Sequence, residues 1–383
     1  LLSFNYSNSI MTTPFVELQT PKNLDIISDV CFMDNTDQHR LLVSNWNSEI
    51  LLFSCDSLLH EHQPPHLQPI NTFTTPDIPL CLLYDNKQNV SPLVGLLDGS
   101  IRELDFENGK LGDNIGDAVD DNNEIDSGIN NLKNVNISGQ NSSSIVASSF
   151  NGKLQLIDTR QSQRQQQKLS PQTFHNQRKI FTMDTSDQYL ILGLQNNIIE
   201  IYDFKNLHHP LETRQVGLKY QIKDLKTFPD NQGFALSTID GRVSMEYFNP
   251  DPQFQLQNRF TFKCHRHPDP NPESAGDLVY PVNSLDFNHK YGTLFTAGSD
   301  GYVCLWDCKK RKRMRQYPRF LSAENEPESI VKLKINRQDN LMVVATSDDN
   351  YKRRRRLSES ENSKTPSRVY VKQLAENECK PKS

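Results

Sequence analysis

A tight turn followed by an alternating strand recurs along the chain, and this repeat constrains the fold more than any other feature. Five copies are LLDGSIRELDF (96–106), SFNGKLQLIDT (149–159), LQNNIIEIYDF (194–204), TIDGRVSMEYF (238–248) and GSDGYVCLWDC (298–308). In four copies an aspartate follows the second turn residue by six positions: Asp105, Asp158, Asp203 and Asp307. SNWNSEILLFS (44–54) is a degenerate first copy, and ATSDDNYK (345–352) begins a last one.

The repeated unit has the chemistry of a hairpin that leads into a half-buried strand. Asp-Gly and Asn-Gly supply the positive φ that a tight hairpin needs, and the alternation in VCLWD buries one face of the strand. Repeats of about 40–50 residues with four short strands each are typical of β-propellers. We therefore predict an all-β, seven-bladed β-propeller. A β-sandwich of regular hairpins is the alternative, but it does not explain the fixed offset.

Such a ring closes only if the last blade takes a strand from the other end of the chain. FVELQTP (15–21) alternates and precedes the first repeat, so we expect it to be the outer strand of blade seven in a single domain over 15–375. Four polar segments interrupt the repeats and are expected to be flexible inserts: 60–69, 116–131, 161–168 and 351–368.

Charge and hydropathy limit the classes of partner. The chain has 42 Lys and Arg against 47 Asp and Glu, and this net charge of −5 creates no basic field for nucleic acid or an anionic membrane. No apolar run is long enough to span a bilayer. We therefore expect neither a membrane nor direct contact with nucleic acid.

No catalytic or cofactor-binding motif is recognisable, so we predict a protein without enzymatic activity and without a cofactor. The run Cys264-His265-Arg266-His267 resembles metal ligands, but no partner pair lies at finger spacing, and we expect a surface or loop role without metal. Cys304 and Cys308 are expected to pack in the core. His60, His62 and His66 are expected to lie in a flexible loop without metal.

Two basic clusters remain. We expect KKRKRMR (309–315) to be a solvated face of an outer strand. KRRRR (352–356) lies in a predicted insert, where a nuclear-import signal or a kinase site are the two hypotheses.

The rim of the ring holds the candidate binding residues. Trp46 and Phe150 occupy equivalent turn positions, where an aromatic ring is either an exposed anchor or folded over a neighbouring blade. Arg242 begins the strand after Asp240-Gly241, and Lys263 ends the next strand, so the two cations are expected to be neighbours in blade five. Such a pair suits a phosphate or carboxylate, and two solvated surface charges are the alternative.

Several segments closely resemble the Bub-family WD40 protein of the spindle assembly checkpoint ("budding uninhibited by benzimidazole"), of fungal type. They are KIFTMDTSDQYLILG (179–193), GLKYQIKDL (217–225), STIDGRVSMEYF (237–248), FTFKCHR (260–266) and YPVNSLDFNHKYGTLFTAGSDGYVCLWD (280–307). The resemblance implies a seven-bladed WD40 propeller that acts as an adaptor in the nucleus and, in mitosis, at the kinetochore. The WD40 factor of nuclear-pore messenger-RNA export is similar and provides the alternative function.

The resemblance also implies two binding sites. A short Glu-containing motif of the checkpoint kinase and its kinase-like partner would be held by the residues that match Trp46, Phe150 and Lys223. The family usually has Trp at Phe150 and Arg at Lys223, so this chain lacks an indole N–H and a planar guanidinium there.

Arg242 and Lys263 match the family residues that read phosphothreonine in Met-Glu-Leu-Thr repeats of a kinetochore scaffold protein. Because Lys223 and Arg242 both belong to blade five, we expect occupancy of one site to influence the other. An enzyme is the third hypothesis, and it would need a convergent acid–base or metal site in the channel.

Overall fold

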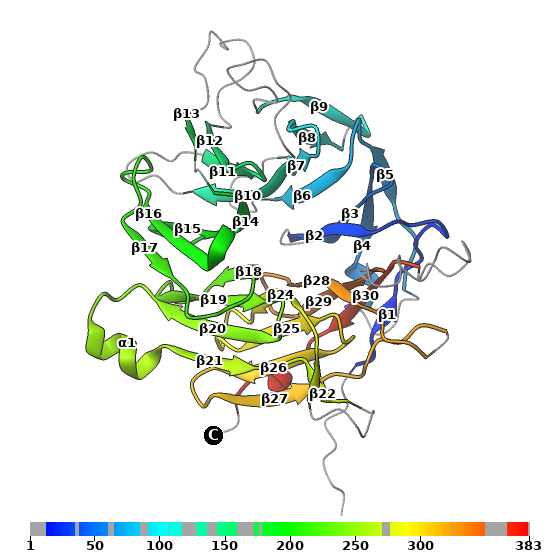
Figure 1. Ribbon diagram of the computed structural model, residues 1–383. Coiled ribbons are helices and arrows are strands. Elements are labelled where there is room, and N and C mark those ends of the chain that lie inside the picture. Colours follow the sequence, from blue (N-terminus) through cyan, green and yellow to red (C-terminus); the bar gives the residue numbers. More distant parts are fainter. Residues whose placement is uncertain are drawn as a thin grey trace, which may run out of the picture.

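Seven four-stranded antiparallel sheets stand around a central channel in the part of the chain that the structure describes, and together they form a β-propeller (Figure 1). This arrangement confirms the predicted all-β, seven-bladed fold and rules out the sandwich. The computed structural model describes residues 13–34, 38–59, 65–84, 91–106, 108–116, 128–135, 144–158, 172–175, 178–269, 276–323, 325–348 and 366–381. In each blade the first strand lines the channel.

Blades one to four follow one another along the chain. Blade one comprises β2 (Ile27–Asp34), β3 (His39–Asn45), β4 (Glu49–Ser54) and β5 (Asn71–Thr74). Blade two comprises β6 (Pro79–Leu83), β7 (Leu93–Leu96), β8 (Ile101–Asp105) and β9 (Lys110–Asn114). Blade three comprises β10 (Ile129–Val135), β11 (Ser144–Ser149), β12 (Lys153–Asp158) and β13 (Gln172–His175). Blade four comprises β14 (Ile180–Thr185), β15 (Tyr189–Leu194), β16 (Ile198–Asp203) and β17 (Glu212–Gln215).

Blades five to seven contain the additional elements. Blade five comprises β18 (Ile222–Thr227), β19 (Gly233–Thr238), β20 (Arg242–Tyr247) and β21 (Phe260–Lys263), with helix α1 (Pro252–Asn258) before its last strand. A separate hairpin, β22 (Arg266–Pro268) and β23 (Asp277–Val279), leads into blade six. Blade six comprises β24 (Val282–Phe287), β25 (Leu294–Gly298), β26 (Val303–Asp307) and β27 (Lys312–Gln316). Blade seven comprises β28 (Ile330–Ile335), β29 (Leu341–Thr346), β30 (Arg368–Gln373) and β1 (Val16–Glu17), and helix α3 (Glu376–Cys379) follows it.

The N-terminal strand closes the ring. Val16 of β1 pairs with Val371 of β30, so blade seven combines strands from both ends of the chain. The strand is shorter than residues 15–21, because Gln19 turns away and donates its N–H to Leu67 at 2.8 Å. This pairing supplies the fourth strand of blade seven and holds the two ends of the described chain together.

The predicted inserts lie largely outside the described residues. Insert 161–168 lies there entirely, as do 60–64, 117–127 and 351–365. The predicted end of the insert 116–131 is wrong. Residues 129–131 belong to β10, where Ile129 is buried against blade two. The last residue of insert 351–368 likewise begins β30.

The hydrophobic core is divided among the blade junctions. Between blades one and two, for example, Leu42 and Ile50 pack with Leu82 and Val94. Each blade therefore buries apolar side chains against its neighbour, and this burial is the main source of stability.

Aspartates of the inner strands also connect neighbouring blades. A carboxylate oxygen of each of four aspartates accepts an N–H from the inner strand of the next blade: Asp29 from Leu82 (3.0 Å), Asp184 from Thr227 (2.8 Å), Asp224 from Leu285 (2.8 Å) and Asp286 from Ile335 (2.7 Å). Hydrogen bonds to a charged acceptor are stronger than neutral ones, so these contacts fix the blades around the channel.

Candidate functional site

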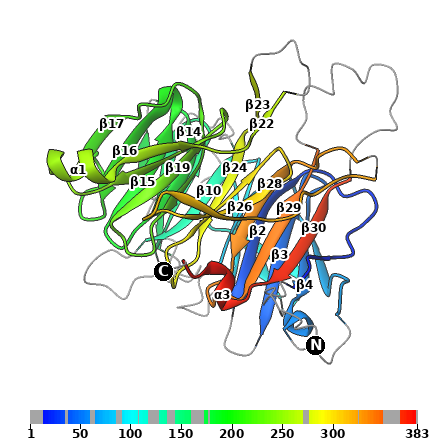
Figure 2. The same ribbon diagram turned by 90° about the horizontal axis from the view of Figure 1, so that it is seen from below.

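One face of the ring carries the turns between the second and third strands of every blade, and we call it the turn face. The first residue of each turn donates its backbone N–H to the carbonyl oxygen of the residue directly before the inner strand of the same blade. These donors are Trp46, Leu97, Phe150, Gln195, Ile239, Ser299 and Ser347. Figure 2 shows the β22–β23 hairpin and α3 on opposite sides of the ring.

Trp46 and Phe150 occupy equivalent positions on the turn face. The Trp46 N–H is 3.0 Å from Ile26 O, and the Phe150 N–H donor lies 3.2 Å from Gly128 O. Both aromatic residues are 42% exposed, so neither is folded into the junction with a neighbouring blade. Rigid, half-exposed rings on a preformed surface are suited to anchoring a peptide.

Leu97 and Ile239 extend this apolar surface, and the sequence reasoning missed them. They occupy the same turn position in blades two and five and are 40% and 39% exposed. Trp46, Leu97 and Phe150 therefore form an apolar arc over three successive blades. The signal was present in the repeat, since each residue directly precedes the turn dipeptide of its own copy.

Lys223 also lies on the turn face, at a β-bulge. Ile222 pairs with Thr238 and Asp224 pairs with Ser237, so Lys223 is the extra residue between them. The same irregularity follows the first residue of all seven inner strands. A bulge re-aims the side chain that it carries, and Lys223 is half-buried at this position.

Arg242 and Lys263 are brought together in blade five. They face each other directly in the register of β20 and β21, and opposite residues in an antiparallel pair project from the same side of the sheet. Lys263 is exposed, and within the described residues no acidic group lies within ion-pair distance of its ammonium.

Asp240 orients Arg242. Its Oδ2 accepts a hydrogen bond from Arg242 Nε at 2.7 Å, while its Oδ1 accepts one from the Thr238 hydroxyl. Arg266 donates from Nη2 to the Asp240 carbonyl oxygen at 2.7 Å. Arg242 is thus held by its Nε edge, and a third cation that the sequence reasoning missed lies beside it.

The expectation of a surface or loop role for Cys264 and His265 is right about the loop, since both lie between β21 and β22, but wrong about the surface. Both residues are buried, because His265 completes a hydrogen-bonded network inside blade six. Its Nδ1 lies 2.8 Å from Asp300 Oδ1 and its Nε2 lies 2.9 Å from the Thr296 hydroxyl. Trp306 Nε1 donates to the same hydroxyl at 3.0 Å.

His267 contributes to the same network at its surface side. Its Nε2 lies 2.9 Å from Asp300 Oδ2. Burial would raise the pKa of Asp300, but the hydrogen bonds from His265 and His267 lower it, so the carboxylate stays charged between the two imidazoles. The motif that resembled metal ligands therefore connects blades five and six.

The remaining sequence candidates are structural or lie outside the described residues. Cys304 is buried and Cys308 packs against the same core. The segment 309–315 leads into the outer strand β27, where its first basic residues are exposed, as expected. His60, His62 and the basic run 352–356 lie outside the described residues, whereas His66 is described and exposed. Among the described helices, none has the length and apolar character needed to cross a bilayer.

Comparison with known proteins gives near-complete matches of one kind. No family model matches the chain. The mitotic checkpoint protein bub3 of Dictyostelium discoideum is 30% identical over 373 residues, which is 97% of this chain and 98% of that protein. Mitotic checkpoint protein BUB3.1 of Arabidopsis thaliana is 30% identical over 370 residues, 96% of this chain and 94% of that protein. The mRNA export factor GLE2 of Chaetomium thermophilum is 31% identical over 210 residues, 55% of this chain and 54% of that protein.

Proposed function

The chain belongs to the Bub3 family of mitotic checkpoint proteins, and from this premise we propose that it is a non-enzymatic adaptor which brings checkpoint kinases to phosphorylated kinetochores. The adaptor would work in the nucleus and, in mitosis, at the kinetochore. The turn face provides the docking surface, because its exposed aromatic residues and its paired cations lie on the same side of the ring.

The first partner is a short Glu-containing motif of the checkpoint kinase and of its kinase-like partner. Trp46 and Phe150 would contact apolar side chains of the motif, and the Lys223 ammonium would pair with its glutamate. A disordered motif loses conformational entropy when it binds, so anchors that are already rigid increase the affinity. Leu97 lies in the arc between the two aromatic residues and would add apolar contact area.

The second partner is a kinetochore scaffold protein with phosphorylated Met-Glu-Leu-Thr repeats. Phosphothreonine carries a charge of about −1.5 to −2 and three acceptor oxygens, whereas threonine carries none of this charge. The direct pairing of Arg242 with Lys263 is the observation that carries the proposal. Two adjacent cations would bind the phosphorylated repeat far better than the unmodified one, and recruitment would then depend on a mitotic kinase.

The test is binding of one Met-Glu-Leu-Thr peptide in phosphorylated and unphosphorylated form to the purified protein, measured by fluorescence anisotropy. We expect tight binding of the phosphorylated peptide only. Equal affinities for the two forms would contradict the phosphate-reading role. A pulldown from mitotic cells with and without phosphatase treatment applies the same test to the natural scaffold protein.

A role in nuclear-pore messenger-RNA export is the second candidate, favoured by the similarity to GLE2 over 55% of the chain. It predicts binding of a nucleoporin motif and a signal at the nuclear rim without a mitotic kinetochore signal. A fluorescent fusion imaged through mitosis separates the two functions.

A further inference from the structure

The central channel carries a charge pattern that the proposed docking function does not use. The fifth residue of each inner strand contributes to one ring of the channel, and this ring comprises Cys31, Leu83, Lys133, Asp184, Lys226, Asp286 and Lys334. Charges therefore alternate over blades three to seven, beginning and ending with a lysine. We call these five charged residues the channel arc.

Two ion pairs use both acids of the channel arc. Lys133 Nζ lies 2.8 Å from Asp184 Oδ1, and Lys226 Nζ lies 3.2 Å from Asp286 Oδ1. Lys334 is the fifth member, and the equivalent residue in the next blade is Cys31, which carries no charge to match it. The channel arc thus has three cations and two anions.

The second oxygen of each acid is already bonded. Asp184 Oδ2 accepts from Thr227 N at 2.8 Å, and Asp286 Oδ2 accepts from Ile335 N at 2.7 Å. A carboxylate that connects two blades in this way cannot turn toward another lysine without losing an inter-blade hydrogen bond. Lys334 has no ion pair within the described residues.

The charged form of Lys334 therefore destabilises the native state. Burial and the charges of Lys226 and Lys133 lower the pKa of Lys334, and the opposing charges of Asp286 and Asp29 do not outweigh them. Lys332 lies two residues earlier in β28 and nearer the turn face. By contrast with Lys334, its ammonium lies 3.5 Å from Asp29, and its pKa is raised despite its burial.

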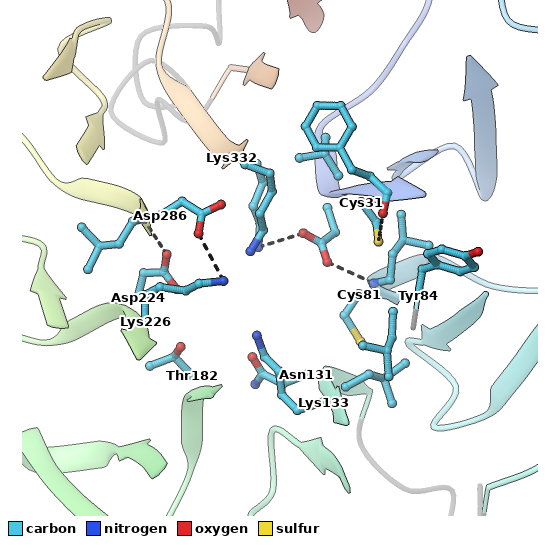
Figure 3. Close-up of a pocket in the computed structure, with 18 of the residues that line it drawn as sticks. Cys31, Cys81, Tyr84, Asn131, Lys133, Thr182, Asp224, Lys226, Asp286 and Lys332 are labelled. Carbon is cyan, nitrogen blue, oxygen red and sulfur yellow. Dashed lines mark hydrogen bonds and ion pairs between the residues drawn. The ribbon is translucent and has the colours of Figure 1, made fainter. Parts of the chain in front are cut away.

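The channel has room for a ligand. Its cavity has a volume of about 490 Å³ and is lined by residues of every inner strand. The charged side chains of these strands that line it are the lysines Lys133, Lys226, Lys332 and Lys334 and the aspartates Asp29, Asp224 and Asp286. In Figure 3 the Lys133 and Lys226 side chains come from different blades and point into this cavity. Arg337 also lines it, so a further cationic group lies toward the opposite face of the ring.

We propose that the channel arc binds a small phosphate-class anion, held by Lys334 with Lys226 and Lys133. A phosphate group offers several acceptor oxygens, so it contacts three ammonium groups at once and offsets the excess positive charge. The bound anion would join blades three, five and seven across the channel. This site is separate from Arg242 and Lys263, which belong to outer strands of blade five.

The test is thermal unfolding and calorimetric titration of the full chain with inorganic pyrophosphate, with sodium chloride at equal ionic strength as the reference. A ligand that binds only the native state stabilises it by RT ln(1 + L/Kd), where L is the free ligand concentration, so the melting temperature rises with ligand concentration. We expect pyrophosphate to raise the melting temperature and chloride to have a smaller effect. Absence of calorimetric binding to the wild-type protein would overturn the proposal.

Three variants locate the binding. Lys334→Met removes the excess charge with little change in length, and we expect at least a tenfold loss of pyrophosphate affinity. Without ligand this variant should unfold at the same temperature as wild type or higher, since it removes an unmatched cation. Lys334→Gln is expected to behave in the same way and provides a second measurement.

Lys110→Met changes an exposed lysine of β9 that lies outside the channel, and it should retain wild-type affinity for pyrophosphate. Unchanged affinity in both Lys334 variants, or an equal loss of affinity in Lys110→Met, would place the anion elsewhere and overturn the proposal.

Discussion

Arg242 and Lys263 are direct partners across β20 and β21, so two cations project from the same side of blade five. Like charges directly opposite each other in a sheet are destabilising, and Asp240 offsets this cost only on the Nε edge of Arg242, at 2.7 Å. The remaining guanidinium nitrogens of Arg242 and the exposed Lys263 ammonium are therefore available to a ligand that carries negative charge. The phosphothreonine of the proposed scaffold partner would provide a charge of about −1.5 to −2 at this place.

Removing either Arg242 or Lys263 should abolish the difference in affinity between the phosphorylated and the unphosphorylated repeat. Arg242→Ala and Lys263→Ala are each expected to weaken the phosphorylated Met-Glu-Leu-Thr peptide by about 1.5–3 kcal/mol, the value of a hydrogen bond to a charged group. The unphosphorylated peptide should be affected much less. Fluorescence anisotropy with both peptides measures the difference, and Lys309→Ala, an exposed cation outside the site, is the control. Preserved phosphate discrimination in Arg242→Ala would contradict this assignment.

Trp46 should act as a binding anchor with little effect on stability. Trp46→Ala is expected to cost about 2 kcal/mol or more in affinity for a peptide with the Glu-containing motif, as is usual for a central aromatic anchor. Because the residue is 42% exposed, the melting temperature should change little. Leu211→Ala is the matched control, since Leu211 is also exposed but lies in the loop between β16 and β17 on the opposite face. Equal peptide affinity of the Trp46 variant and wild type would remove Trp46 from the site.

Asp184 should make stability depend on pH in the acidic range. Burial would raise the pKa of Asp184, but Lys133 and Lys226 hold it well below its ordinary value. A carboxyl group with a lowered native pKa stabilises the fold fully above its unfolded pKa of about 3.9 and loses this contribution as the pH falls below it. Asp184→Asn should therefore be about 3 kcal/mol less stable than wild type at pH 7, the usual cost of breaking a buried pair.

Urea unfolding at pH 7 and at successively lower pH measures this difference, which should shrink as the pH falls through the acidic range. Asp113→Asn, at an exposed position of β9, should match wild type throughout. A difference between Asp184→Asn and wild type that stays constant down to the lowest pH would contradict the electrostatic explanation.

The network around His265 should be structural. Thr296→Val removes the hydroxyl that accepts from Trp306 Nε1 and contacts His265 Nε2, and it changes the shape of the side chain very little. A buried donor left without a partner costs about 1–3 kcal/mol, so the variant should unfold at lower urea concentration with an unchanged m-value. Its affinity for both peptides should be that of wild type, and a selective loss of peptide binding would show that the network has a role in the site.

Local chemistry explains which parts of the molecule were predictable from the sequence. The turn dipeptides require positive φ, and Gly99, Gly152, Gly241 and Gly301 have it, so the blades and the turn positions of Trp46 and Phe150 follow from nearby residues. The bulge at Lys223 depends on the register between two strands, which no dipeptide encodes. His265 is buried by Asp300, 35 residues further on, and a short motif cannot reveal such a partner.

The two proposed docking sites should be coupled, because a short path of contacts joins them. Lys223 is the bulged residue beside Thr238, and the Thr238 hydroxyl donates to Asp240, which in turn holds Arg242. A motif glutamate on Lys223 would restrict this region and orient Arg242 before the phosphate arrives. Coupling between sites is typically 1–3 kcal/mol, so the motif peptide should raise phosphopeptide affinity about 5–150-fold.

Titrating the phosphopeptide with and without saturating motif peptide measures the coupling, and thermodynamic linkage requires the same factor in the reverse experiment. Thr238→Val removes the hydroxyl that links the bulge to Asp240. It should therefore reduce the coupling factor, while each peptide still binds to the protein in the absence of the other. Ser299, the first turn residue of blade six, lies outside this path, and Ser299→Ala should leave the factor unchanged. Identical phosphopeptide affinities in the presence and absence of the motif peptide would mean that the sites act independently. Binding of the motif at Lys223 would then not change the free energy of phosphate binding at Arg242.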